Sequence, residues 1–335
     1  MRLPLRLASV ALLLLAAPAG AELVQARSGE RGWYARTDAG EACVADRGDG
    51  AASCWELAPG GRLSDLAETS DGWLAAGWEH DGRDLDVFVV RASGAGRERL
   101  PAVPSRHSPR GRPRLVVEHG RLLGIVWLEG ASQPVLEVRA AQWLDGAWGP
   151  VLTVSPRGVG SQVAPDVTVL EDGRWLALWT AFDGSDDETL WSVYDGASWS
   201  APHRLHEDNA VPDITPVVLV AGGGAIAAWS SFDGRDYRLR TAFFDGRSWR
   251  LGPPLAGRGA TRAELSLAAG STLLRYHTVV PEEWVGVELD PRGRVLRRAA
   301  LASGRLESPW VGSAGSGVTF RWPPAAEVLA PWEDR

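Results

Sequence analysis

The chain has 335 residues, of which 39 are Gly, 22 are Pro and 17 are Trp, with 45% hydrophobic and 23% charged residues. This composition excludes a disordered tail, a collagen-like chain and a coiled coil. The net charge is -7 and every basic residue is Arg, so the charge balance provides no general attraction to nucleic acid.

The first 21 residues have the pattern of a secretory signal peptide. Arg2 and Arg6 precede an apolar run over 7–17, and small residues at 19 and 21 form an A-x-A cleavage pattern. The apolar run is shorter than the ~20 residues that cross a bilayer, so it does not predict a membrane anchor. We expect cleavage after Ala21 and a secreted or periplasmic chain with no membrane span.

The next feature in the chain is its only pair of cysteines, Cys43 and Cys54. A turn-rich stretch, 46–50, lies between them and could bring the chain back beside itself as a hairpin. An exported chain favours a disulfide here, and the spacing is not that of a C-x-x-C redox or metal pair. We therefore predict a Cys43–Cys54 disulfide.

A sequence repeat organises the rest of the chain. The stretches 167–184 and 218–234 align, and each continues to a second Asp-Gly pair and a Trp, at Trp199 and Trp249. Aromatic residues recur every ~50 residues, as in blade-type repeats, at positions 78, 127, 179, 229 and 276. Fainter copies at 32–35 and 317–322 bring the preferred number of copies to seven, or six if the first is an extension.

Within one copy, runs of about five hydrophobic residues alternate with Gly- and Asp-rich turns, which predicts short antiparallel strands and no long helix. Four such strands per copy predict an all-β fold, a β-propeller of four-stranded antiparallel blades. Residues 22–335 then form one domain, in which Glu22 to Arg27 could complete the last sheet. The recurrent aromatics are expected to pack between blades.

These residues resemble the secreted bacterial propellers of the sialidase (BNR-like) superfamily and the related lectin-type propellers. Sialidase blades carry the Asp box, S-x-D-x-G-x-x-W, and three turns here keep its Asp, Gly and aromatic residue. They begin at Asp145, Asp195 and Asp245, and they place Gly directly after Asp. Val193, Phe243 and Trp143 stand where that box has Ser or Thr. In that family the box is structural, so the resemblance implies the architecture and not catalysis.

A sialidase also needs three Arg to bind a carboxylate, a Tyr nucleophile paired with Glu, and an acid/base Asp. A guanidinium can bind a carboxylate bidentately. The Arg candidates near blade connections are Arg110, Arg112, Arg114, Arg258 and Arg262. Tyr237 is the one loop-proximal Tyr, and the sequence assigns it no Glu partner. We therefore predict no catalytic residues.

In a propeller, the loops between second and third strands emerge at the same rim as the connections between blades. The candidate ligand-binding residues of this rim are Asp81, Asp84, Arg110, Arg112, Asp183, Asp187, His206, Asp233, Asp236, Tyr237 and Arg262. The alternative for each Asp is a turn-forming role, because Asp-Gly pairs are typical of tight turns. Carboxylates at 183, 186, 187 and 188 could hold calcium. Their spacing is not that of an EF-hand loop, and we predict no metal or cofactor.

Carboxylates, guanidinium groups and a few aromatics around a rim suit a polar ligand. The sequence therefore predicts a secreted, monomeric, non-catalytic propeller that binds a glycan, a peptide or a protein. The alternatives are a glycan-cleaving enzyme on the same fold and a structural scaffold, because one fold supports many functions.

Overall fold

The structure of the chain is a computed structural model. It describes residues 22–27, 33–38, 40–46, 52–80, 85–105, 110–132, 135–155, 160–207, 211–255, 258–268, 271–301, 310–311 and 319–320. The predicted signal peptide lies outside these residues. The described residues contain strands and no helix, so no helix among them could span a membrane.

The strands form consecutive antiparallel sheets. The first sheet contains β1 (Glu22–Gln25), β2 (Tyr34–Asp38), β3 (Glu41–Ala45) and β4 (Ser53–Glu56). The second contains β5 (Arg62–Glu68), β6 (Gly72–His80), β7 (Leu85–Ser93) and β8 (Gly96–Arg99). The third contains β9 (Arg110–Glu118), β10 (Arg121–Ser132), β11 (Val135–Leu144), β12 (Ala147–Trp148) and β13 (Leu152–Thr153).

The second half of the chain continues the pattern. The fourth sheet contains β14 (Gln162–Val169), β15 (Trp175–Phe182), β16 (Asp187–Tyr194) and β17 (His203–Arg204). The fifth contains β18 (Asp213–Ala221), β19 (Gly224–Phe232), β20 (Tyr237–Phe244) and β21 (Trp249–Leu251). The sixth contains β22 (Thr261–Ala268), β23 (Ser271–Thr278), β24 (Glu283–Leu289) and β25 (Val295–Leu301).

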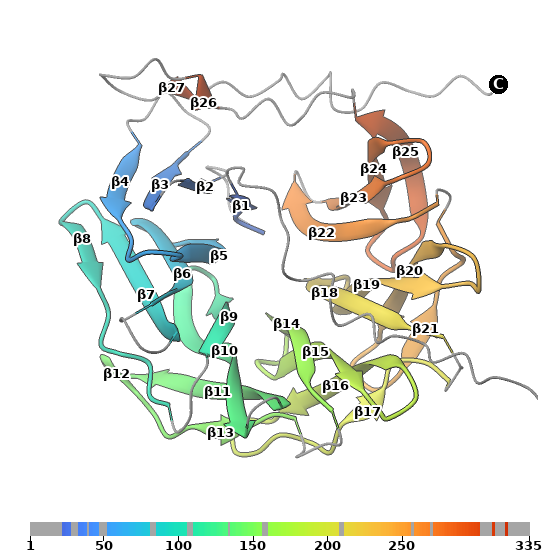
Figure 1. Ribbon diagram of the computed structural model, residues 1–335, viewed down its shortest axis with the longest axis horizontal. Helices are drawn as coiled ribbons and strands as arrows, with labels where there is room; N and C mark the ends of the chain where they lie inside the picture. The colour runs from blue at the N-terminus through green and yellow to red at the C-terminus, as the bar shows by residue number, and fades with distance from the viewer. Residues whose placement is uncertain are drawn as a thin grey trace, which may run out of the picture.

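The six sheets stand around a central axis, with the first strand of each sheet innermost (Figure 1). This arrangement confirms the predicted β-propeller of four-stranded antiparallel blades. A separate pair, β26 (Trp310–Val311) with β27 (Thr319–Phe320), falls in the seventh copy expected from the sequence. Most of that copy lies outside the described residues, so a seventh blade stays a prediction.

The first and sixth blades contact each other near the axis. The expectation that Glu22 to Arg27 complete the last sheet is wrong, because β1 pairs with β2 in the first sheet. The contact with the sixth blade is a backbone hydrogen bond instead, from Leu267 N to Arg27 O at 2.7 Å. The segment after β1 therefore bonds to β22 of the sixth blade, and the two blades do not share a sheet.

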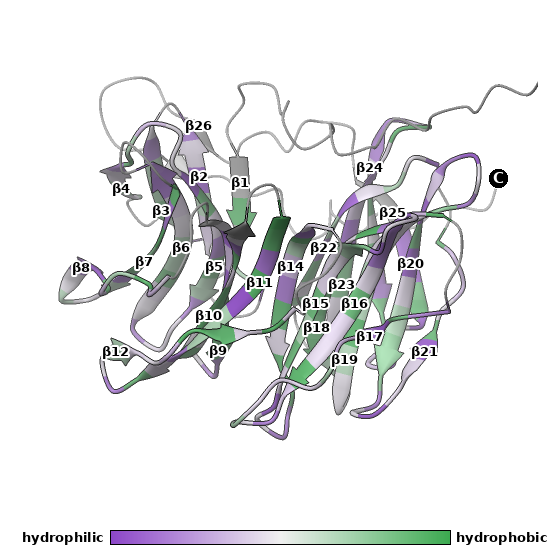
Figure 2. Ribbon diagram, turned by 60° about the horizontal axis from the view of Figure 1, so that its bottom comes forward, coloured by the Kyte–Doolittle hydropathy of each residue, from purple (hydrophilic) through white to green (hydrophobic). Residues whose placement is uncertain are grey.

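The core lies between neighbouring sheets, which bury their hydrophobic strand faces against each other (Figure 2). Four of the recurrent aromatics, Trp127, Trp179, Trp229 and Tyr276, are fully buried, as predicted. Trp78 differs, because in the second blade Gly77 and not Trp78 takes the equivalent register position. Phe88 fills the space there: a Cβ on Gly77 would lie 2.7 Å from its ring. Trp78 is consequently only half-buried.

A network of four charged side chains occupies the axis; we call Arg27, Asp65, Arg114 and Asp166 the axial network. Arg27 pairs closely with Asp166, and Arg114 lies 3.7 Å from Asp65 and 3.5 Å from Asp166. Burial opposes the charge of Arg27, but the two carboxylates outweigh burial and raise its pKa above the ordinary value. The second oxygens of the carboxylates accept backbone N–H groups of the next blades, from Leu115 to Asp65 at 2.8 Å and from Val218 to Asp166 at 2.7 Å.

A bulge precedes the axial position of several inner strands. Arg112, Ala164, Thr215 and Arg262 each have a positive φ, between 47° and 54°. Arg112 and Ala164 stand two residues before Arg114 and Asp166 of the axial network, and the strand register shifts beside all four. A bulge of this kind bends a strand and redirects its side chains. Two Arg of the predicted ligand set, Arg112 and Arg262, are therefore bulge residues, both exposed.

The disulfide and the Asp-box-like turns are local supports. Cys43 and Cys54 lie opposite each other on β3 and β4 and form the predicted disulfide. At the turn after β16, Asp195 Oδ1 accepts the N–H groups of Ala197 and Ser198, at 2.9 and 2.8 Å. Asp245 accepts Arg247 N and Ser248 N in the same way in the fifth blade. These Asp residues are turn formers.

Candidate functional site

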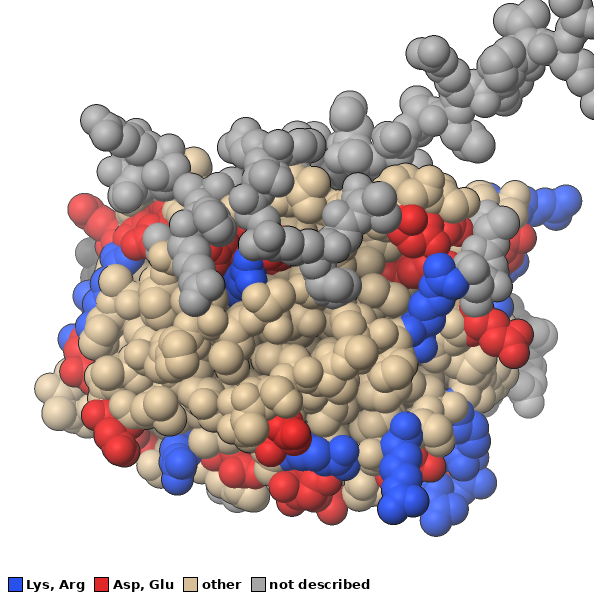
Figure 3. Space-filling view, turned by 90° about the horizontal axis from the view of Figure 1, so that it is seen from below, with Lys and Arg blue, Asp and Glu red and all other residues tan. Residues whose placement is uncertain are grey.

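The predicted site residues that the structure describes lie at the loops between second and third strands or at the connections between blades. Hydrogen bonds from the ends of second strands to the blade connections confirm that both emerge together, as between Phe182 N and Ser161 O and between Phe232 N and Pro212 O. In the side view, charged side chains gather along the two rims, whereas the surface between them is mostly neither acidic nor basic (Figure 3). The two rims, rather than the surface between them, therefore present charged side chains to a ligand.

Three of the predicted carboxylates are engaged by backbone N–H groups of their own loops or by Arg side chains of the chain. Asp183 Oδ1 accepts Ser185 N at 2.8 Å, and its Oδ2 lies 2.8 Å from Arg204. Asp233 accepts Asp236 N at 2.8 Å and Arg238 Nε at 2.9 Å, and these bonds lower its pKa to about 2. Asp236 pairs with Arg258 at 2.7 Å. The turn-forming alternative therefore describes Asp183 and Asp233, whereas Asp236 is held by an ion pair, and all three carboxylates are engaged.

Asp187 and Tyr237 take equivalent places in neighbouring blades. Each begins the third strand of its blade and lies opposite a Phe, as Asp187 opposite Phe182 and Tyr237 opposite Phe232. Burial, and then the charge of Asp183, raise the pKa of Asp187. Burial, and then the charges of Asp187 and Asp213, raise the pKa of Tyr237. The half-buried phenol thus lies within electrostatic range of two carboxylates and stays protonated.

His206 lies in the connection between the fourth and fifth blades, over the start of β18. Its Nε2 is 3.4 Å from Asp213 Oδ2, and the Asp213 side chain is 2% exposed. The other carboxylate oxygen accepts the indole N–H of Trp229 at 3.2 Å. A buried carboxylate is stable only with such partners. Asp213 therefore holds the imidazole and the core Trp in one arrangement.

We call Asp187, His206, Asp213 and Tyr237 the rim cluster. Asp213 was missing from the predicted site. A comparison of the copies could have found it, because the equivalent residue of the fourth blade is Gln162, whose amide oxygen accepts Trp179 Nε1 at 2.7 Å. Both blades satisfy the buried indole, the fourth with an amide oxygen and the fifth with a carboxylate. The third blade also uses a carboxylate, since Glu129 accepts Trp127 Nε1 at 3.3 Å. What distinguishes Asp213 is that its other oxygen lies 3.4 Å from His206 Nε2.

The remaining predicted residues are distributed elsewhere. Asp81 and Asp84 lie outside the described residues, and Arg110 begins β9. Of the five Arg considered for a carboxylate clamp, Arg114 belongs to the axial network and Arg258 is bonded to Asp236. Arg114 and Arg258 thus pair with carboxylates of the chain itself.

Three of the four carboxylates considered for calcium lie close together in the structure. Asp183, Asp186 and Glu188 each place an oxygen within 4.8 Å of the others, and Asp187 is not in this group. Arg204 already pairs with Asp183, and Glu188 is 2% exposed. Carboxylate oxygens are the ligands that calcium prefers. The three groups fit that ligand type, but clustering alone does not assign a metal.

No known protein family and no curated protein matches this sequence. Solved structures do match the fold. An Aleuria aurantia lectin mutant in complex with Fucα1-6GlcNAc matches with a TM-score of 0.53 at 13% identity, covering 91% of this chain and 97% of the lectin. A second structure of that fungal lectin, described as a six-bladed β-propeller with a novel fucose recognition mode, gives 0.51 at 12% identity over 91% and 97%.

A prolyl endopeptidase structure also matches, with a TM-score of 0.52 at 15% identity, over 81% of this chain and 39% of that protein. Identities this low show a shared fold alone. The chain is therefore similar in architecture to β-propellers with different functions, and the choice between those functions rests on its own side chains.

Proposed function

We propose that this protein is a secreted β-propeller that binds a glycan at the rim cluster. The observation that carries the proposal is that Tyr237 lies within electrostatic range of Asp187 and of Asp213, the partner of His206, where two adjacent blades adjoin. Sugar hydroxyls both donate and accept hydrogen bonds, and a carboxylate, a phenol and an imidazole offer both functions.

Aromatic surface beside these groups supports a sugar over a purely charged ligand. Phe182 is 39% exposed and lies opposite Asp187, and Phe232 is half-buried against Tyr237, with ring centroids 5.4 Å apart. Binding sites typically combine apolar and aromatic walls with a few placed polar groups. The similarity in fold to a fungal lectin solved with Fucα1-6GlcNAc is compatible with this ligand class.

A glycan-cleaving enzyme is the second candidate, because one observation favours it. A carboxyl group with a raised pKa can act as a general acid, and Asp187 is such a group near the phenol Tyr237. Peptide or protein binding, and a role as a scaffold, are further outcomes of the same test.

The test is a glycan array probed with the mature protein, run beside hydrolysis assays on fluorogenic glycosides. We expect glycan binding without turnover, and binding that Tyr237→Phe weakens. Tyr194→Phe is the matched control, because the Tyr194 hydroxyl donates to Gly196 O at the opposite rim. Turnover that Tyr237→Phe abolishes would establish the enzyme instead. The absence of any glycan bound would contradict the proposal and favour the protein-binding or scaffold roles.

A further inference from the structure

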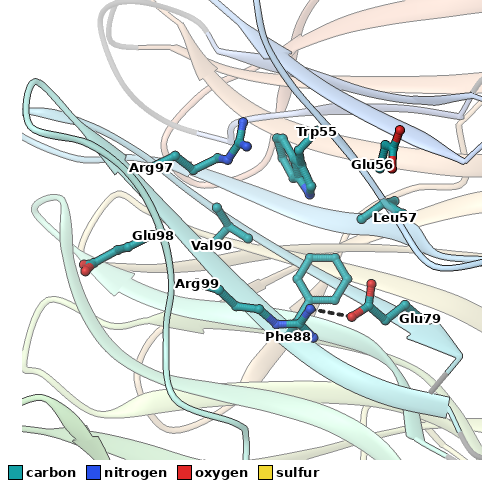
Figure 4. A pocket seen from close by; sticks show the side chains of 9 residues that line it. All are labelled: Trp55, Glu56, Leu57, Glu79, Phe88, Val90, Arg97, Glu98 and Arg99. Carbon is teal, nitrogen blue, oxygen red and sulfur yellow. Dashed lines mark hydrogen bonds and ion pairs between the residues drawn. The ribbon is translucent and has the colours of Figure 1, made fainter.

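A polar cavity lies on the side of the ring, between the first and second blades and away from the rim cluster. It has a volume of about 110 Å³. Its walls are β4 with the residues after it and strands β7 and β8, and we call it the lateral cleft (Figure 4). Its lining residues are Trp55, Glu56, Leu57, Glu79, Phe88, Val90, Arg97, Glu98 and Arg99.

Two guanidinium groups enter the lateral cleft from the same strand. Arg97 and Arg99 are two residues apart on β8, so their side chains leave the strand on the same face. The Arg97 guanidinium lies 5.0 Å from the centre of the Trp55 ring, and that of Arg99 lies 4.9 Å from the centre of the Phe88 ring. Stacking on aromatic rings fixes a planar guanidinium and leaves its edge available.

The two Arg differ in how their charge is compensated. Arg99 pairs closely with Glu79, whose other oxygen accepts Ala58 N at 3.3 Å. Within the part of the chain that the structure describes, Arg97 donates only through Nη1, to Cys54 O at 2.8 Å and Ser53 Oγ at 3.4 Å. Among the described residues no carboxylate lies within ion-pair distance of Arg97. Its Nε and Nη2 edge is therefore positively charged, held in place and free to bind an anion.

The rest of the lateral cleft is suited to a small ring rather than to an inorganic ion. Val90 and Phe88 are 5% and 3% exposed and form an apolar floor. Glu56, on the side away from Arg97 in Figure 4, offers an acceptor for hydroxyl groups. A volume of about 110 Å³ is below the ~300 Å³ of a full ligand pocket, so the cleft suits the end group of a longer molecule.

We propose that the lateral cleft binds the terminal acidic sugar of a glycan, with the sugar carboxylate on the Nε/Nη2 edge of Arg97. Arg–carboxylate contact is bidentate and charge-assisted, which gives selectivity for an acidic over a neutral sugar. This site lies on a different face from the rim cluster and does not depend on the ligand bound there.

The probes are methyl β-D-glucuronide and its neutral counterpart methyl β-D-glucoside, titrated into the full mature chain by ligand-observed NMR. We expect the glucuronide to bind about 10-fold more tightly, because only its carboxylate makes the charge-assisted contact with Arg97. A tenfold ratio of affinities corresponds to about 1.4 kcal/mol. Raising the salt concentration should reduce this ratio. Equal affinity for the two probes would overturn the proposal.

Variants locate the effect. Arg97→Gln should remove the preference for the glucuronide, and Arg97→Lys, which keeps the charge without the planar fork, should retain part of it. Arg174→Gln in the fourth blade is the control, since Arg174 pairs with Asp172 at 2.7 Å and neither residue lines the lateral cleft. A preference unchanged by Arg97→Gln, in a variant with unchanged thermal unfolding, would overturn the assignment.

Two further arms separate other outcomes. Tyr237→Phe should leave glucuronide binding at the lateral cleft unchanged. Failure of the rim cluster to bind glycan would therefore be distinguishable from failure of the lateral cleft to bind the glucuronide. N-acetylglycine carries a carboxylate without a sugar ring, and it should bind more weakly than the glucuronide. Tighter binding of N-acetylglycine would show a site for peptide C-termini and would contradict the sugar assignment.

Discussion

The axial network and the rim cluster both contain buried or half-buried carboxylates, but they treat negative charge in opposite ways. On the axis, Asp65 and Asp166 face Arg27 and Arg114 and accept backbone N–H groups. At the rim, burial and then the charge of Asp183 raise the pKa of Asp187. A group held where its charge is disfavoured does not stabilise the fold, so the difference separates a structural set from a candidate functional one.

The largest effect is expected on the axis. Asp166→Ala leaves Arg27 and the N–H of Val218 without their carboxylate, and removing one partner of a buried charged pair costs about 3–5 kcal/mol in the free energy of unfolding. Urea denaturation measures this loss. The control is Asp172→Ala in the same blade, where an exposed carboxylate pairs with Arg174 and the change should stay within about 0.5 kcal/mol. Similar losses in both variants would contradict the structural role of the axis.

Asp213 has an intermediate position, because it belongs to the rim cluster and also satisfies a core Trp. Asp213→Ala should lower the free energy of unfolding by about 1–3 kcal/mol, since the buried Trp229 N–H loses its acceptor. Asp213→Asn keeps an amide oxygen there, as Gln162 does for Trp179, and should be nearly neutral for stability. Thermal unfolding of the pair checks this. If Asn were as destabilising as Ala, the charge and not the hydrogen bond would support the fold.

Removing the charge of Asp187 should have a small effect of the opposite sign. The folded chain disfavours the ionised carboxylate, so Asp187→Asn should slightly increase the free energy of unfolding at neutral pH while it weakens glycan binding. Asp195→Asn, at the turn of the opposite rim, is the matched control and should leave glycan binding unchanged. Chemical denaturation and a titration with the glycan from the array measure the two effects. A loss of stability in Asp187→Asn would place this residue with the structural set.

The same raised pKa predicts how glycan binding depends on pH. Protonated Asp187 no longer accepts a hydrogen bond with its full charge, and its pKa lies above the ordinary carboxyl value. As the pH falls, the affinity should therefore begin to decrease at a higher pH than an ordinary Asp would give. Calorimetric titrations across acidic pH measure the profile. The Asp187→Asn variant should not show this decrease, and an identical profile in wild type and variant would contradict the role of Asp187.

The sequence was sufficient for the fold because the repeat marks it. The recurrent aromatics and the Asp-Gly turns are local requirements of a blade, and their spacing is visible without coordinates. Trp78 was misplaced because the second copy fills the equivalent site with Gly77 and Phe88, a substitution across two strands that no linear pattern reveals.

The site was less accessible from the sequence for a physical reason. The sequence does not distinguish Asp183, Asp187 and Asp233. Only the structure shows that Arg204 pairs with Asp183 and Arg238 with Asp233. Asp213 is marked by its contact with His206 of the blade connection, and the lateral cleft depends on contacts between blades. Arg97, for example, meets Trp55 from the neighbouring blade.

The most direct test of the central claim, that the rim cluster is the glycan site, is a crystal structure of the mature protein with the best glycan from the array. We predict a sugar in contact with the Tyr237 hydroxyl and the Asp187 carboxylate, with His206 still held by Asp213. A sugar bound only at other surfaces, with the rim cluster uncontacted at saturating glycan, would contradict the account.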